Sequence, residues 1–85
     1  MYHLTYLKLL LVKDINMSRL KTLGLNIKKF RKEKKLSQNQ LAEMLDFSRE
    51  HLACVETGKE YISLRKVFEL ADKLEVPIKN IFNFD

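Results

Sequence analysis

The stretch LSQNQLAEMLDFSREHLACVETGK, residues 36–59, decides the fold because it contains the starts and ends of two short helices. Ser37 suits the N-cap of the first helix, since its hydroxyl oxygen can accept a hydrogen bond from a free backbone N–H of the first turn. Gln40, three residues later, completes a capping-box pattern with it. The apolar face of this helix carries Leu41, Ala42 and Leu45.

The second helix of the stretch begins after the dipeptide Asp46-Phe47. Ser48 provides its N-cap, and Gly58 stands where a helix commonly ends in a left-handed conformation. Two short helices joined by so tight a link cross at a steep angle, and the second helix then projects from the surface. We therefore predict a helix-turn-helix whose second helix offers one face to a partner.

The outer face of the second helix has the chemistry of a DNA-reading surface. With Leu52 placed inward, steps of about 100° per residue put Val55 and Glu56 on the same side. The opposite face and its flank present donors, acceptors and small surfaces, which the base edges in a major groove require. The residues expected there are Arg49, Glu50, Ala53 and Cys54, with Thr57 beside them.

The sequence before the motif predicts a first helix with a basic outer side. Leu23, Ile27 and Phe30 fall at helical spacing, and the pattern ends near Lys35. Residues 28–35 read KKFRKEKK, which is six cations and one Glu. Such a run is often a solvated helix face, but its place just before the motif favours general attraction to DNA phosphates.

The sequence after the motif predicts two more helices. Ser63 caps a fourth helix, and the pair Val76-Pro77 stops it because proline disfavours helical geometry in the residue before it. Pro77 itself suits the first turn of a short fifth helix. The inward residues expected are Leu64, Val67, Phe68, Ala71 and Leu74 in the fourth helix, and Ile78, Ile81 and Phe82 in the fifth.

Length and composition favour one small all-α domain. The chain has 85 residues, 46% of them apolar and 32% charged, as is typical of a soluble globular protein. Two Gly and one Pro are too few for the many turns of a sandwich or a barrel. The net charge of +5 and the sequence pI near 9.4 suit a polyanionic partner.

Enzyme, metal and membrane functions find no support in the sequence. Cys54 is the only cysteine, so no internal disulfide is expected and the cytoplasm is the expected location. His3 and His51 form no ligand cluster with it at metal-site spacing. The apolar run at residues 4–12 is too short to span a bilayer. No catalytic triad pattern and no Gly-rich phosphate loop is visible, so we expect neither enzyme activity nor a cofactor.

Residues 36–59 resemble the helix-turn-helix of the phage repressor and Cro-like (Xre) family of bacterial and phage transcription regulators. The shared pattern is L-S-Q, L-A, a serine cap, an E-x-G ending and a final L-x-V helix pair. The resemblance continues through SLRKVFELADKLEVPIKNIF, residues 63–82. It implies a five-helix, lambda-repressor-like DNA-binding domain over residues 23–82, with residues 1–22 as an N-terminal extension.

The resemblance also implies how the domain docks on double-stranded DNA. The helix from Ser37 lies across the phosphate backbone, and the helix from Ser48 enters the major groove. Arg49, Glu50 and Cys54 match base-facing positions. Gln38 matches a position that holds a phosphate through its side chain and the helix N-terminus. The full set of residues expected to contact the DNA backbone is Ser37, Gln38, Ser48, Thr57 and Lys59.

Arg31 and Glu56 match a pair that forms a buried or half-buried salt bridge in some members of the family. Helical spacing agrees, because it places Glu56 on the inward side of its helix. A carboxylate in that position needs a cation beside it.

Three residues depart from the family pattern. Asp46 stands where glycine is usual, at a turn position that favours a positive φ. Ile62 replaces a common proline, so the loop there is expected to differ in shape. Glu50 is unusual near phosphates unless it accepts from a cytosine amine or pairs with Arg49. We interpret Cys54 as a small residue that fits the groove rather than as a thiol switch.

Residues 1–22 fall largely outside the resemblance and are too apolar for an ordinary disordered arm. They pack on the domain, join two subunits, or lie upstream of a natural start at Met17. The sequence leaves these alternatives open.

The expected activity is transcriptional regulation by a repressor. A homodimer would place two recognition helices about 34 Å apart on a symmetric operator. The alternative is a protein-interaction module with the same fold, such as an antitoxin that binds a toxin. A toxin-like or restriction-enzyme gene next to this one would favour the antitoxin or controller role.

Overall fold

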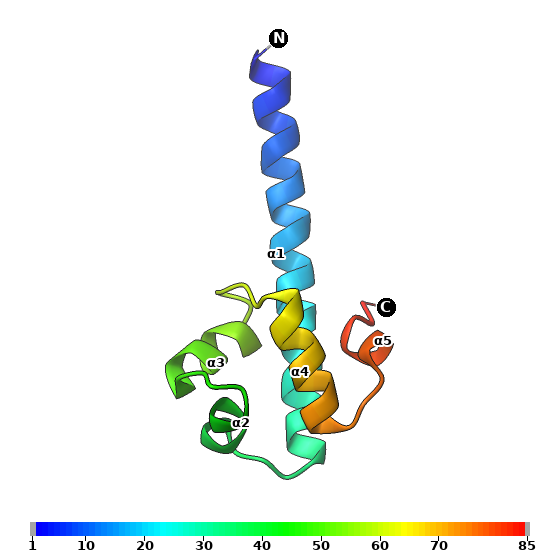
Figure 1. The fold of residues 1–85 in the computed structure, drawn as a ribbon. Coiled ribbons are helices and arrows are strands. Elements are labelled where there is room, and N and C mark those ends of the chain that lie inside the picture. Colours follow the sequence, from blue (N-terminus) through cyan, green and yellow to red (C-terminus); the bar gives the residue numbers. More distant parts are fainter. Residues whose placement is uncertain (1, 85) are drawn as a thin grey trace.

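The computed structural model describes the backbone of residues 2–84 and the side chains of residues 18–84. Its five helices are α1 (Tyr2–Glu33), α2 (Gln38–Met44), α3 (Arg49–Glu56), α4 (Leu64–Leu74) and α5 (Ile78–Ile81). Figure 1 shows α1 as the long axis, with α2 and α3 on one side of its second half and α5 on the other. The described backbone contains no strand, and the predicted five-helix all-α class is confirmed.

Helix α1 ends close to the predicted position but begins much earlier. The prediction started this helix at Leu23 and ended it near Lys35, whereas the structure has one unbroken helix from Tyr2 to Glu33. No proline or glycine stands before Gly24, so no helix-breaking residue interrupts the segment. The predicted division between extension and domain falls inside α1.

The serine caps are confirmed. Gln40 N–H donates to Ser37 Oγ at 3.0 Å, and Ser37 N–H donates to Gln40 Oε1 at 2.8 Å, which completes the capping box. Ser48 Oγ accepts from a first-turn N–H at 3.0 Å, and Ser63 Oγ does the same at 3.1 Å. The three caps fix where α2, α3 and α4 begin.

A residue with positive φ stands at or just after the end of each of the helices α1 to α4. Gly58 has a φ of 76°, as predicted for the end of α3, and Asp46 has a φ of 60° at the turn position where glycine is usual. Lys35 and Glu75 also have positive φ, 58° and 56°, after α1 and at the end of α4. These last two are not glycines, and the sequence did not predict their conformation.

The core is formed by all five helices, and one part of its prediction was wrong. Leu64 and Phe68 are 58% and 50% exposed, and Phe82 is 37% exposed, although all three were expected to face inward. Leu70 is fully buried in their place, because the inward side of α4 is centred on it. The buried apolar residues are Leu23, Ile27, Leu41, Ala42, Leu45, Leu52, Val55, Val67, Leu70, Ala71, Leu74 and Ile81.

Gly24 allows α1 and α3 to approach closely. A Cβ atom at this position would lie 2.4 Å from the carbonyl oxygen of Val55 and 2.5 Å from that of Glu56. Both atoms belong to the backbone of α3, so no side chain could move aside to make room. The close approach holds the C-terminal end of α3 against α1.

Candidate nucleic-acid interface

The link between α2 and α3 is held by a backbone hydrogen bond, by the Phe47 ring and by Lys66 of α4. Phe47 N–H donates to the carbonyl of Ala42 at 2.8 Å, and the Phe47 ring meets the His51 ring edge-on, with centroids 4.5 Å apart. Lys66 of α4 donates to the Leu45 carbonyl at 2.7 Å and lies over the Phe47 ring. These contacts fix the angle between the two helices.

Helix α3 has a buried side and an open side. Leu52, Val55 and Glu56 are at most 3% exposed and face the core. Arg49 and Glu50 are exposed in the first turn, and the remaining expected base-reading residues, Ala53 and Cys54, are partly exposed. The structure thus places all four residues where a partner of α3 could reach them.

The residues expected to contact the DNA backbone differ in how free their polar atoms are. Ser37, Ser48, Thr57 and Lys59 are exposed, and Gln38 is partly buried. The oxygens of the two serines already accept helix N–H groups. The Thr57 hydroxyl donates within its own helix to the Ala53 carbonyl at 2.9 Å, so it must rotate to donate to a phosphate.

Arg31 and Glu56 form a buried, two-pronged ion pair. Arg31 Nε donates to Glu56 Oε2 at 2.7 Å, and Nη2 donates to Oε1 at 3.0 Å. Their side chains are 8% and 1% exposed. Arg31 Nη1 also donates to the Leu36 carbonyl at 2.9 Å, which ties the end of α1 to the start of α2.

Two polar contacts near α3 were missed by sequence reasoning. Gln38 Nε2 donates to Glu56 Oε1 at 3.0 Å, although Gln38 was assigned only to a phosphate. His51 Nδ1 lies 2.5 Å from Glu60 Oε2, which links the first turn of α3 to the loop after it. The two partners are 18 residues apart in the first contact and 9 residues apart in the second. No short sequence pattern therefore predicts either contact.

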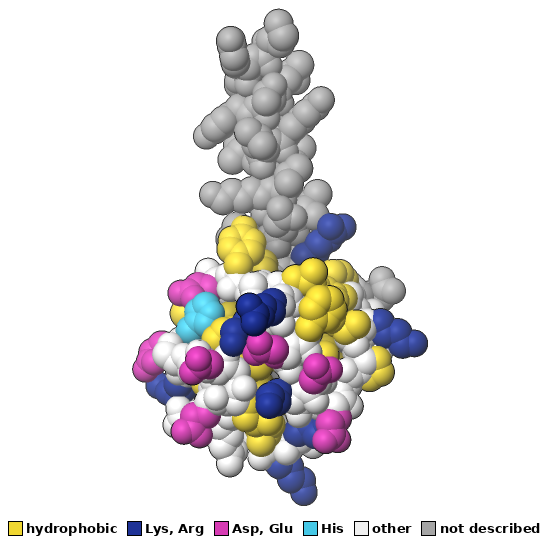
Figure 2. Space-filling view, viewed as in Figure 1, with side chains coloured by type: hydrophobic (Ala, Val, Ile, Leu, Met, Phe, Trp, Pro, Cys, Tyr) yellow, Lys and Arg dark blue, Asp and Glu magenta, His cyan; other side chains and the backbone are white. Residues whose placement is uncertain are grey.

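Charge is distributed unevenly over the described surface. Figure 2 shows acidic and basic side chains interspersed on the face that carries α4, so that face has no continuous basic area. The basic run at residues 28–35 instead lies at the C-terminal end of α1 and in the turn that leads to α2, and all of its lysines are exposed. Arg31 is the buried exception in this run.

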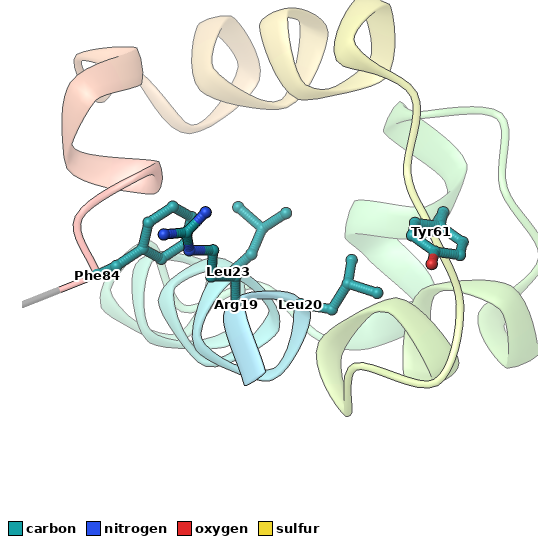
Figure 3. Close-up of a pocket in the computed structure, with 5 residues that line it drawn as sticks. All are labelled: Arg19, Leu20, Leu23, Tyr61 and Phe84. Atoms are coloured by element: carbon teal, nitrogen blue, oxygen red, sulfur yellow. The ribbon is translucent and has the colours of Figure 1, made fainter. Parts of the chain in front are cut away.

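A shallow apolar pocket lies away from the open side of α3. Figure 3 shows Tyr61 on one side of it and Phe84 on the other, with Leu20 and Leu23 of α1 between them and Arg19 beside them. Its volume is about 190 Å³. Apart from the Arg19 side chain and the Tyr61 hydroxyl, its lining offers no reactive polar side chain. Among the residues that the structure describes, no group of three His, Cys, Asp or Glu could hold a metal ion.

Two short capped helices that cross at a tight link, the second with one side open, define a helix-turn-helix protein. The family model for the helix-turn-helix (HTH_3) matches residues 27–80, and the chain belongs to this family. Membership supports a role in DNA-binding transcriptional regulation.

Solved structures with the same fold include two restriction-modification controller proteins. C.AhdI from Aeromonas hydrophila is 30% identical, with a TM-score of 0.70 over 74% of this chain and 96% of that chain. C.Esp1396I is 26% identical, with a TM-score of 0.62 over 78% of this chain and 95% of that chain. A hypothetical transcription factor, NHTF, from Neisseria is 25% identical, with a TM-score of 0.71 over 79% and 75%.

A search of curated protein sequences found no match. Within the part of the chain that the structure describes, no helix combines the length and the apolar character needed to cross a membrane.

Proposed function

We propose that this protein is a sequence-specific transcriptional repressor that reads the major groove of double-stranded DNA with α3. One observation carries the proposal. Helix α3 is anchored by Leu52, Val55 and Glu56 on its inner side, while Arg49 and Glu50 stand exposed at its start. Side chains on a rigidly packed helix can be presented to base edges without large ordering costs.

The four base-reading residues have distinct chemical roles in this proposal. Arg49 has the forked donors that match the O6 and N7 atoms of guanine. Glu50 can only accept, which suits the amine of cytosine and disfavours a nearby phosphate. Ala53 and Cys54 are small, so they allow α3 to approach the base edges closely.

Residues on both sides of α3 contact the phosphate backbone of the DNA. They are Gln38, Thr57 and Lys59, together with Ser37 and Ser48 at the starts of their helices. The exposed lysines of residues 28–35 add attraction without reading sequence. No cofactor takes part, and the protein acts in the cytoplasm.

The repressor acts as a homodimer on a two-fold symmetric operator. Two α3 helices then enter successive major grooves about 34 Å apart. Exposed apolar side chains on and before α4, namely Tyr61, Leu64 and Phe68, support a second subunit, because a monomer leaves them in water. Figure 1 shows the first half of α1 projecting beyond the other helices, which favours a role in joining subunits over packing on its own domain.

Selection of bound sequences from random duplex DNA tests this function. The proposal expects enrichment of one consensus with two-fold symmetry and half-sites about one helical turn apart. An unenriched pool after repeated rounds would contradict sequence-specific binding. An enriched but asymmetric consensus would contradict the homodimer.

A second candidate is the control of a restriction-modification system. The similarity to C.AhdI and C.Esp1396I, each covered over nearly its whole length, favours it. This role keeps the DNA-binding mechanism and changes only the regulated genes. The antitoxin alternative adds a toxin as a protein partner. A neighbouring restriction-enzyme gene favours the controller, and a neighbouring toxin gene favours the antitoxin.

A further inference from the structure

The carboxylate of Glu56 joins the buried core to a side chain at the interface. Its Oε2 accepts from Arg31 Nε at 2.7 Å. Its Oε1 accepts from two donors, Arg31 Nη2 at 3.0 Å and Gln38 Nε2 at 3.0 Å. Glu56 is 3% exposed, whereas Gln38 is partly exposed, so the amide of Gln38 closes the network on the outside.

The network fixes which way the Gln38 amide faces. An amide nitrogen carries two hydrogens, and the bond to Glu56 uses one of them. A flipped amide would turn its carbonyl oxygen toward the carboxylate, where two acceptors would oppose each other. The second N–H of Gln38 is therefore left for a ligand in a defined orientation.

The charge of the network suits an anionic ligand. The guanidinium of Arg31 offsets the carboxylate of Glu56, and its third nitrogen, Nη1, is occupied by the Leu36 carbonyl. A phosphate that approaches Gln38 meets an ion pair whose two charges offset each other, rather than an exposed carboxylate.

We propose that Glu56 is a positioning residue for DNA binding, which orients the amide of Gln38 so that one N–H donates to a backbone phosphate. This inference rests on the proposed DNA-binding function. It adds that the buried ion pair contributes both to the stability of the fold and, through Gln38, to the affinity for DNA. Orientation before binding removes the cost of ordering Gln38 when the complex forms.

A double-mutant cycle on the selected duplex tests the coupling. Glu56→Gln keeps the side-chain size but replaces one acceptor oxygen with a donor, so it cannot accept from Arg31 Nε, Arg31 Nη2 and Gln38 Nε2 at once. This change should weaken binding about 3- to 10-fold in the native background and less than about 2-fold when Gln38→Ala is also present. Circular dichroism and thermal melting establish that each variant is folded. Equal weakening in both backgrounds would overturn the positioning role.

The free, unmodified protein offers an independent readout. At least one of the Gln38 side-chain amide protons should resonate away from the positions typical of a solvated glutamine amide. Resonances that coincide with those of a solvated glutamine would overturn the inference, even if Glu56→Gln failed to fold. Failure of the unmodified protein to bind any duplex would instead overturn the proposed function on which the inference rests.

Discussion

At Asp46 the backbone adopts a conformation that an L-residue with a side chain rarely takes. Its φ of 60° costs about 1–2 kcal/mol relative to a right-handed helix, and glycine avoids that cost. Asp46→Gly should therefore raise the free energy of unfolding by about 1 kcal/mol in a urea titration, after part of the gain is lost to the freer unfolded chain. Asp46→Ala serves as the control and should bring no gain. If Asp46→Gly is less stable than the unmodified protein, the positive φ at Asp46 does not cost the expected free energy.

The stability of the domain depends on the buried ion pair between Arg31 and Glu56. Glu56→Ala leaves Arg31 buried without its partner and should cost on the order of 3 kcal/mol of unfolding free energy. Glu75→Ala is the matched control, because Glu75 pairs with Lys34 at 3.5 Å while its side chain is 79% exposed. The control should cost under about 1 kcal/mol. Similar losses in the two variants would show that burial does not set the strength of the Arg31 pair.

Local chemistry explains which residues could be predicted. The N-caps at Ser37 and Ser48 were predictable because a cap and its N–H partner lie within one turn of each other. The contact of Gln38 with Glu56 was not, because it joins two helices whose separation only the folded chain sets. The sequence predicted that Glu56 faces inward, but it carried no sign that a third side chain completes its hydrogen bonds.

At the scale of elements, the packing of α1 on α3 depends on the absence of a side chain at Gly24. Gly24→Ala would put a Cβ atom 2.4 Å from the Val55 carbonyl oxygen, so α3 must shift or the helices must separate. We expect a loss of about 2 kcal/mol or more in thermal or urea unfolding, together with weaker DNA binding. Leu25→Ala, next in the chain and 62% exposed, should change stability little. An unaffected Gly24→Ala variant would contradict the close approach.

The ends of a helix could be predicted where the sequence carries a capping or helix-breaking residue. Helices α2, α3 and α4 begin at serine caps, and their starts were predicted. The start of α1 was missed because its expected beginning at Leu23 has no cap and no breaking residue before it. The exposure of Leu64 and Phe68 was missed because both are apolar residues at helical spacing on the edge of the buried face.

The role of the first half of α1 in the whole molecule can be tested by deletion. Deletion of residues 1–16 starts the chain at Met17 and leaves the described side chains in place. If the segment joins subunits, light scattering should show a monomer, and melting should occur at a lower temperature. An unchanged number of subunits and an unchanged melting temperature would favour Met17 as the natural start.

In the proposed function, α3 reads base sequence through Arg49 and Glu50. The direct measurement is the selection of bound duplexes by the unmodified protein, Arg49→Ala and Glu50→Gln, with unfolding measured in parallel. Arg49→Ala should cost roughly 1–3 kcal/mol on the best site and much less on random DNA. Glu50→Gln adds a donor and should move one symmetric pair of operator positions toward adenine. Stability should stay nearly unchanged, because both side chains are exposed. Identical consensus sequences for all three proteins would contradict this assignment of the reading face.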